Sequence, residues 1–148
     1  MASIDDLRRL VALDHGLANL ATQRGDGTVQ GTVVNAGVID HPLTGQPVPA
    51  FVGRAGTHKL DYLRRNPAAT LCWRAGWAWA TVEGLVELAG PDDPHPDISA
   101  AAIPALLRTI YSAAGGGEHQ DWADYDRVMA AERRVAVLLT PRRIYVNP

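Results

Sequence analysis

The sequence has little cysteine and little lysine: Cys72 and Lys59 are the only residues of their kinds among 148. A single cysteine excludes an intrachain disulfide and a cysteine-rich metal site. No apolar run approaches the roughly 18 residues of a membrane span. The acidic start of the chain also has no basic segment followed by an apolar one, so we expect a cytoplasmic protein without a leader.

The chain also lacks a block of charge of either sign. It has 14 lysines and arginines against 16 aspartates and glutamates, which gives a formal net charge of −2. Nucleic-acid-binding proteins gather basic residues on one face, so we predict no nucleic-acid partner. With 47% hydrophobic and 20% charged residues, the composition is that of a globular protein, and the length suits a single domain over residues 1–148.

Motifs for chemistry by the polypeptide itself are missing. Four histidines fall in predicted turns or loops, where we expect solvated side chains, and no pair has the spacing of metal ligands: His15, His41, His95 and His119. There is no Gly-x-Ser-x-Gly nucleophile motif. Cys72 lies in an apolar strand segment and is expected in the core. We therefore predict no metal site and name no catalytic residue; an enzyme of this sequence would depend on a cofactor.

The order of the predicted elements favours an antiparallel barrel. Ser3 begins a helix that Gly16 closes, and further helices are expected at 58–65, at 98–114 with a disturbance at Pro104, and at 121–132. Strands are expected at 17–22, 28–39, 48–53, 69–73, 77–88, 135–139 and 144–146. Hairpins join most of these strands, whereas a parallel sheet needs a helix between each pair. The prediction is a mainly β fold with peripheral helices.

Two strand segments have faces that suit a ligand. In 28–39, Thr32 and Asn35 could hydrogen-bond a planar heterocycle, and the glycines Gly31 and Gly37 indicate either bulges or close approach of a ligand. In 77–88, alternating small residues suit a barrel interior. The opposite face of that strand carries Trp77 and Trp79, which need cover from a subunit interface, a flat aromatic ligand or the later helices.

The segment 54–60 joins a strand to a helix. Unpaired N–H groups at a helix start attract anions, and Gly56, Thr57, His58 and Lys59 lie at this start. The segment therefore predicts a phosphate site. The alternative is an ordinary capped helix with a solvated lysine.

Three stretches now carry a family resemblance: Leu20-Ala21-Thr22, Thr57-His58-Lys59-Leu60 leading to Asn66-Pro67-Ala68-Ala69, and Val82-Glu83-Gly84; the closing Pro141-Arg142-Arg143-Ile144-Tyr145 agrees with them. The chain resembles the flavin reductase-like split-barrel superfamily named after pyridoxamine 5′-phosphate oxidase. Within it, the chain is most similar to the actinobacterial branch that uses the deazaflavin coenzyme F420. The resemblance implies a six-stranded antiparallel split β-barrel of the FMN-binding type, and a homodimer with cofactor sites in grooves between the subunits.

The resemblance also implies roles for residues. Thr57 and Lys59, with His58 where the family often has arginine and with Gly56 beside them, would hold the cofactor phosphate. The second strand would line the ring through Thr32, Val33, Val34 and Asn35. Trp73, Trp77 and Trp79 become candidates for the groove wall, in part across the dimer.

The expected function is hydride transfer from reduced F420 to a small electron-poor organic acceptor. The alternatives are an FMN-dependent reductase or oxidase of the same fold, and a cofactor carrier without turnover. Pyridoxamine-phosphate oxidases continue with a C-terminal segment bearing arginine and histidine, and this sequence stops at Pro148. We therefore expect a substrate other than vitamin B6.

Overall fold

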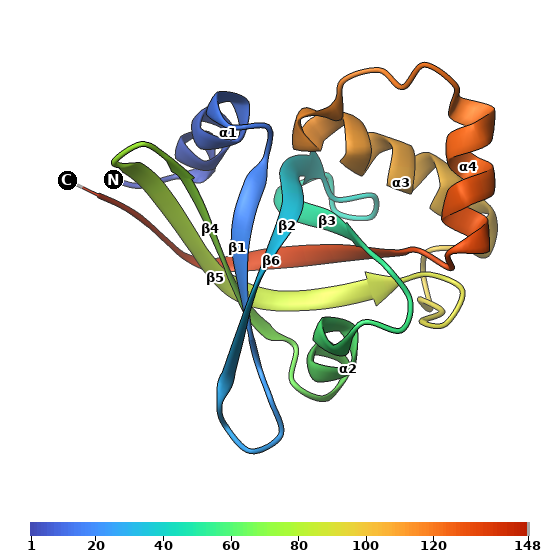
Figure 1. The fold of residues 1–148 in the computed structure, drawn as a ribbon, viewed down its shortest axis with the longest axis horizontal. Coiled ribbons are helices and arrows are strands. Elements are labelled where there is room, and N and C mark those ends of the chain that lie inside the picture. The colour runs from blue at the N-terminus through green and yellow to red at the C-terminus, as the bar shows by residue number, and fades with distance from the viewer. Residues whose placement is uncertain (148) are drawn as a thin grey trace.

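A closed six-stranded barrel forms the centre of the computed structural model, which describes residues 1–147 (Figure 1). Pro148, the last residue of the predicted domain, lies outside the described residues. Neighbouring strands are antiparallel and follow the order β1-β2-β3-β6-β5-β4. The strands are β1 (Leu17–Gln23), β2 (Val29–Asp40), β3 (Pro47–Gly53), β4 (Ala68–Ala75), β5 (Ala78–Ala89) and β6 (Val135–Val146). The predicted antiparallel split barrel is confirmed.

The helices lie outside the barrel (Figure 1): α1 (Ile4–Leu13), α2 (His58–Arg65), α3 (Ile103–Tyr111) and α4 (Trp122–Ala131). The helix predicted over 98–114 with a disturbance at Pro104 is present as three consecutive pieces: the 3₁₀ turn η1 (Ala100–Ala102), α3 and the turn η2 (Ser112–Gly116). Pro104 stands in the first turn of α3, where a missing N–H leaves no hydrogen bond unmade, so it starts the helix instead of disturbing it.

β6 is one strand, although the sequence predicted two. The register between β5 and β6 shifts at a bulge: Glu83 pairs with Arg143 and Gly84 with Pro141, which leaves Arg142 as the extra residue. Gly84 is required there because a Cβ at this position would lie 2.1 Å from the carbonyl oxygen of Thr140. The bulge accommodates Pro141, which in the sequence predicts a break between two strands.

Alternation along β6 builds two apolar cores. Val135, Val137 and Leu139 point into the barrel, whereas Ala136 and Leu138 face outward into a second core beneath α3. The barrel core also contains the small face of β5 that the sequence assigned to the interior. The second core fixes α3 against the barrel with three buried side chains, Leu106, Leu107 and Ile110.

The barrel splits along β2. This strand pairs with β1 from Val29 to Asn35, but with β3 only from Ala36 to Asp40. Beyond Phe51, β3 remains paired with β6 and leaves β2 behind. Residues 29–35 of β2 therefore have a neighbour on one side only, and the open side is where the candidate site lies.

Candidate functional site

The open edge of β2 presents main-chain hydrogen-bonding groups. The N–H of Ala36 donates to the carbonyl oxygen of Gly16 at 2.8 Å, on the β1 side of the strand. Because N–H and C=O groups alternate in direction along a strand, those of Val33 and Asn35 point to the opposite side, away from β1. Both residues line a cavity there. Main-chain donors and acceptors at this edge are thus available to a ligand.

The cavity, here called the split groove, has a volume of about 490 Å³. The open edge of β2 forms one wall, the end of β3 with the start of α2 forms a second, and α3, η2 and α4 form a third. The lining residues are Val33, Val34, Asn35, Phe51, Val52, Gly53, Arg54, Lys59, Ile110, Tyr111, Ala114, His119, Asp124, Tyr125, Val128, Met129 and Arg134.

Cationic side chains give the split groove a positive character. Arg54 and Arg134 share one carboxylate, that of Glu132, at 3.3 and 3.1 Å. Lys59 is half-buried, and its ammonium forms no ion pair with any carboxylate of residues 1–147. Asp124 also lines the groove but pairs with Arg127 at 2.6 Å. An anionic group of a ligand would therefore find Lys59 without a competing partner.

The residues beside Lys59 shape the turn. Gly56 has a φ of +81°, which favours glycine, and the hydroxyl of Thr57 donates to the carbonyl oxygen of Arg54 at 2.9 Å. The exposed ring of His58 stacks on Tyr62. Of the four residues predicted for the phosphate site, Lys59 lines the groove, whereas Gly56, Thr57 and His58 are not among the lining residues.

Of the four residues predicted on β2, Val33, Val34 and Asn35 line the groove and Thr32 does not. Thr32 has a buried hydroxyl without a hydrogen-bond partner, and the hydroxyl of Thr22 and the side-chain amide oxygen of Gln30 nearby are also buried and unpaired. The side-chain amide of Asn35 donates to the carbonyl oxygens of His15 and Ala114, at 2.5 and 2.8 Å, so its hydrogens are used within the protein.

The tryptophans predicted for the groove wall lie elsewhere in the protomer. Trp73 is 1% exposed in the barrel core, on the same inward face of β4 as Leu71. Its predicted place at the groove wall is therefore wrong. Trp77 is 92% exposed at the β4–β5 turn, and Trp79 packs edge-to-face on Tyr145. This turn is at the far end of the barrel from α4 (Figure 1). A contribution across a dimer stays a prediction for Trp77 and Trp79.

An aromatic cluster in the third wall was not predicted. Tyr111, His119, Trp122 and Tyr125 pack with ring centroids 5.2 to 5.7 Å apart. His119 was expected to be solvated, but it is half-buried because α4 carries Trp122 and Tyr125 onto it. Its Nδ1 accepts the N–H of Asp121 at 2.9 Å, so the proton of the neutral ring is on Nε2. The spacing of Trp122 and Tyr125 on one helix face was the available signal.

The side chain of Tyr125 is fixed within this cluster. Its hydroxyl donates to the carbonyl oxygen of Leu107 at 3.1 Å. Burial raises the pKa of Tyr125 to about 12. Tyr125 therefore stays protonated at neutral pH and acts as a rigid wall of the groove.

Two more histidines differ from their predicted solvated state. His41 is 6% exposed and the side chain of His95 is 10% exposed. Each accepts a main-chain N–H at Nδ1, from Leu43 and Asp97, and each contacts the carboxylate of Glu87 through Nε2. Burial opposes ionisation of Glu87, but these hydrogen bonds outweigh it and hold its pKa below the usual range. The trio ties β5 to two loops.

Within residues 1–147, no cluster of three or more histidine, cysteine, aspartate or glutamate side chains is arranged to hold a metal ion. None of the helices in this part of the chain is long and apolar enough to cross a membrane.

Comparison with known proteins supports the fold. No family model matches the chain. A conserved hypothetical protein of Mycobacterium tuberculosis is similar, with a TM-score of 0.72 at 20% identity over 99% of this chain and 84% of that one. An F420 reductase has a TM-score of 0.56 at 19% identity over 91% of this chain and 93% of that one. An FMN-binding protein of Nostoc punctiforme, related to pyridoxamine 5′-phosphate oxidase, has a TM-score of 0.61 at 18% identity over 97% and 79%. The chain thus has the split-barrel fold of these proteins.

Proposed function

We propose that the protein is an oxidoreductase that binds F420 in the split groove and passes a hydride from the reduced deazaflavin to a small electron-poor organic acceptor. The observation that carries the proposal is the open edge of β2 facing a half-buried lysine without an ionic partner. Support from comparison is the shared fold of an F420 reductase and an FMN-binding protein.

The residues present fit such a cofactor. The pyrimidine edge of a flavin or deazaflavin ring alternates hydrogen-bond donors and acceptors, as do the main-chain groups of Val33 and Asn35 at the open edge. A phosphate on the side chain of the cofactor would bind Lys59, with Thr57 and His58 close by in sequence. Arg54 and Arg134 extend the positive surface toward any further anionic group.

The chemistry supplied by the bound cofactor is hydride donation from its ring. The chain contributes orientation and exclusion of water, through the strand edge on one side and the aromatic wall of Tyr111 and Tyr125 on the other. His119 lines the same wall and holds a proton at Nε2. We infer that the Nε2–H of His119 donates a hydrogen bond to a ligand bound in the groove.

We further propose that the protein works as a cytoplasmic homodimer. Apolar side chains on the outside of the barrel lack cover in one protomer: Val29, Val33 and Leu17 are 63%, 64% and 45% exposed. A second copy would cover them. The free, half-buried Cys72 is compatible with a reducing compartment.

FMN is the second candidate cofactor, because it also joins a tricyclic ring to a phosphate. We therefore test both by titrating the apo-protein with F420 and with FMN while following tryptophan fluorescence, with Trp122→Phe as the control that shows how much of the signal comes from Trp122. We expect F420 to bind with a Kd of about 1 μM, equivalent to about 8 kcal/mol, and FMN to bind more weakly. Tighter FMN binding would move the protein to flavin chemistry, and binding of neither would overturn the proposal.

A turnover assay separates the enzyme from a carrier. Reduced F420 is mixed with the protein and a quinone, a nitroaromatic compound or an unsaturated ketone, and its oxidation is followed by absorbance. Catalytic oxidation over many equivalents supports the enzyme. Binding without any turnover across these acceptor classes would indicate a carrier.

A further inference from the structure

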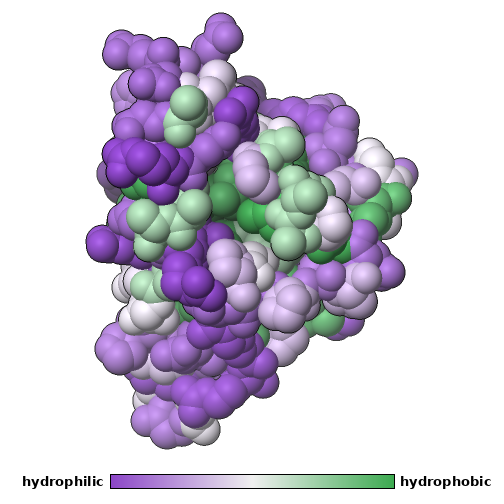
Figure 2. Space-filling view, turned by 90° about the vertical axis from the view of Figure 1, so that its right-hand side faces the viewer, coloured by the Kyte–Doolittle hydropathy of each residue, from purple (hydrophilic) through white to green (hydrophobic). Residues whose placement is uncertain are grey.

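A second cavity lies beside the split groove and is lined by residues of α3, α4 and the loop after β5. Figure 2 views the molecule from the side on which α4 and this loop lie in Figure 1. Its volume is about 410 Å³, within the range of small-molecule sites. Figure 2 shows apolar surface in the middle of this face with polar residues around it. None of the residues that the sequence predicted to bind cofactor lines this cavity.

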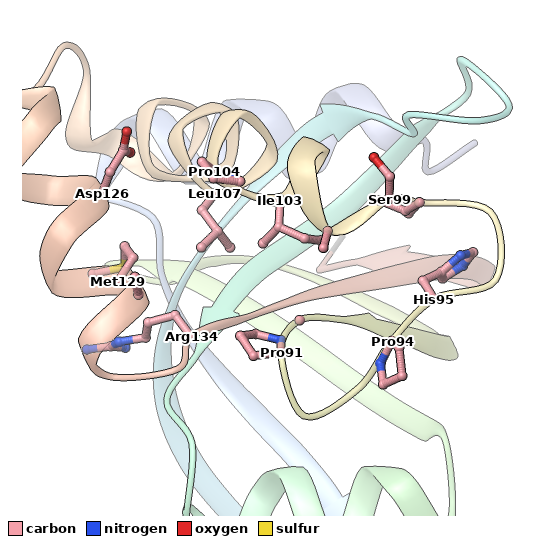
Figure 3. Close-up of a pocket in the computed structure, with 14 residues that line it drawn as sticks. Pro91, Pro94, His95, Ser99, Ile103, Pro104, Leu107, Asp126, Met129 and Arg134 are labelled. Carbon is pink, nitrogen blue, oxygen red and sulfur yellow. The ribbon is translucent and has the colours of Figure 1, made fainter.

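The walls of the cavity come from three segments (Figure 3). Ile103 and Leu107 project from α3, Met129 from α4, and Pro91 and Pro94 from the loop after β5. Ile98, which is 6% exposed, closes the loop side. Apolar atoms therefore dominate the surface that an occupant would meet.

Ion pairs hold the loop wall in place. Arg64 donates to both oxygens of Asp93, at 2.7 and 2.8 Å, and Arg133 contacts the neighbouring Asp92. These contacts join the loop to α2 and to the residues before β6. A wall that is ordered before binding loses little conformational freedom when a ligand enters.

The charged groups at the cavity are already paired. Asp126 accepts two hydrogen bonds from Arg108, at 2.9 and 2.5 Å, and Arg134 contacts Glu132. His95 is held between Glu87 and the N–H of Asp97. A charged ligand would lose its hydration without gaining a free counterion, whereas Ser99 at the mouth can hydrogen-bond a neutral polar group.

We propose that this cavity binds an uncharged, mainly apolar small molecule. The site is separate from the cofactor proposal and stands without it. Met129 and Arg134 line both the cavity and the split groove, so an occupant contacts a wall that the two sites share.

The test uses the neutral fluorescent dye N-phenyl-1-naphthylamine and the full chain. Ala130→Phe and Ala100→Phe fill the cavity from opposite walls at exposed positions, and Ala131→Phe is the matched control, since Ala131 is exposed on the same helix but does not line the cavity. We expect saturable dye binding that weakens about tenfold, or about 1.4 kcal/mol, in both filling variants. The control should bind the dye like the parent protein.

Circular dichroism and thermal unfolding establish that each variant is folded. Dye affinity unchanged in both filling variants, or weakened equally in Ala131→Phe, would place the dye elsewhere and overturn the proposal. The charge of the ligand is tested by displacing the dye with methyl 2-naphthylacetate and with free 2-naphthylacetate. We expect the neutral ester to displace it more strongly; stronger displacement by the acid would overturn the assignment to an uncharged ligand.

Discussion

The indole Nε1 of Trp73 donates a 3.1 Å hydrogen bond to the main-chain carbonyl oxygen of Ala36 in the barrel core. Ala36 is the first residue of β2 that pairs with β3, so this bond sits where the barrel splits. A side chain from β4 thus satisfies the carbonyl group of Ala36, which faces the β1 side of the strand at the residue where pairing with β3 begins.

Trp73→Phe should lower the free energy of unfolding by about 1–3 kcal/mol, because the buried carbonyl oxygen of Ala36 loses its donor. Urea denaturation measures the change. Trp77→Phe is the matched control, since Trp77 is 92% exposed, and it should change stability by less than about 0.5 kcal/mol. Equal effects of the two substitutions would contradict the structural role of the Trp73 bond.

Gly37→Ala should destabilise the protein, whereas Gly31→Ala on the same strand should not. A Cβ at position 37 would lie 2.4 Å from the main chain of Ala113, so the close approach predicted here is to the chain itself. Such overpacking costs about 1–3 kcal/mol. A Cβ on Gly31 meets nothing within 4 Å. Thermal unfolding of the two variants compares them, and similar melting temperatures would show that η2 moves freely away from β2.

Glu87→Gln should make the free energy of unfolding less dependent on pH in the acid range. The pKa of Glu87 is lowered in the folded protein from its ordinary 4.5, so the unfolded chain takes up the proton first as pH falls. The contribution of Glu87 is therefore full above pH 4.5 and is lost as pH falls through the lower folded value. At neutral pH the variant should be less stable, since the amide cannot accept hydrogen bonds from both His41 and His95.

Urea unfolding of the parent and Glu87→Gln proteins across this pH range gives the comparison. Exposed Glu118 provides the control substitution Glu118→Gln. Curves for Glu87→Gln and the parent that run parallel down to acid pH would argue against the histidine contacts as the cause of the lowered pKa.

Lys59→Ala should weaken binding of a phosphate-bearing cofactor while sparing its phosphate-free analogue. The loss should be about tenfold or more, because one charge-assisted contact to phosphate is removed. Calorimetric titration compares FMN with riboflavin, or F420 with its phosphate-free deazaflavin core. Arg74→Ala removes an exposed cation that does not line the split groove and should leave both affinities unchanged. A parallel loss for both ligands would remove Lys59 from the phosphate site.

Local signals in the sequence were enough for most of the fold. The helix predicted at 58–65 has the bounds of α2, and a hairpin joins β1 to β2, as expected for most of the strands. Pro141 misled the prediction for β6, because a proline reads as a break and the compensating bulge depends on Gly84 in another strand. Trp73 could have been assigned to the core, because in a strand it shares a face with Leu71 two residues earlier.

The site was harder to predict, because its walls come from distant segments. Val33, Val34, Asn35 and Lys59 were predicted and are brought together in one groove. The helical wall with His119 was missed, since nothing local shows that α4 packs against α3, across the groove from β2. The contact of His41 with Glu87 joins residues 46 positions apart, so the local sequence around His41 predicted a solvated loop residue.

The one-sided pairing of residues 29–35 of β2 also bears on how the protein behaves in storage and expression. An unpaired strand edge is a template for any other strand, and this one carries Val29 and Val33 with 63% and 64% of their surfaces exposed. The edge that receives a ligand is therefore also the place where ligand-free molecules can aggregate by pairing their strand edges. Purification in the presence of the ligand would protect the protein by occupying the same hydrogen-bonding groups.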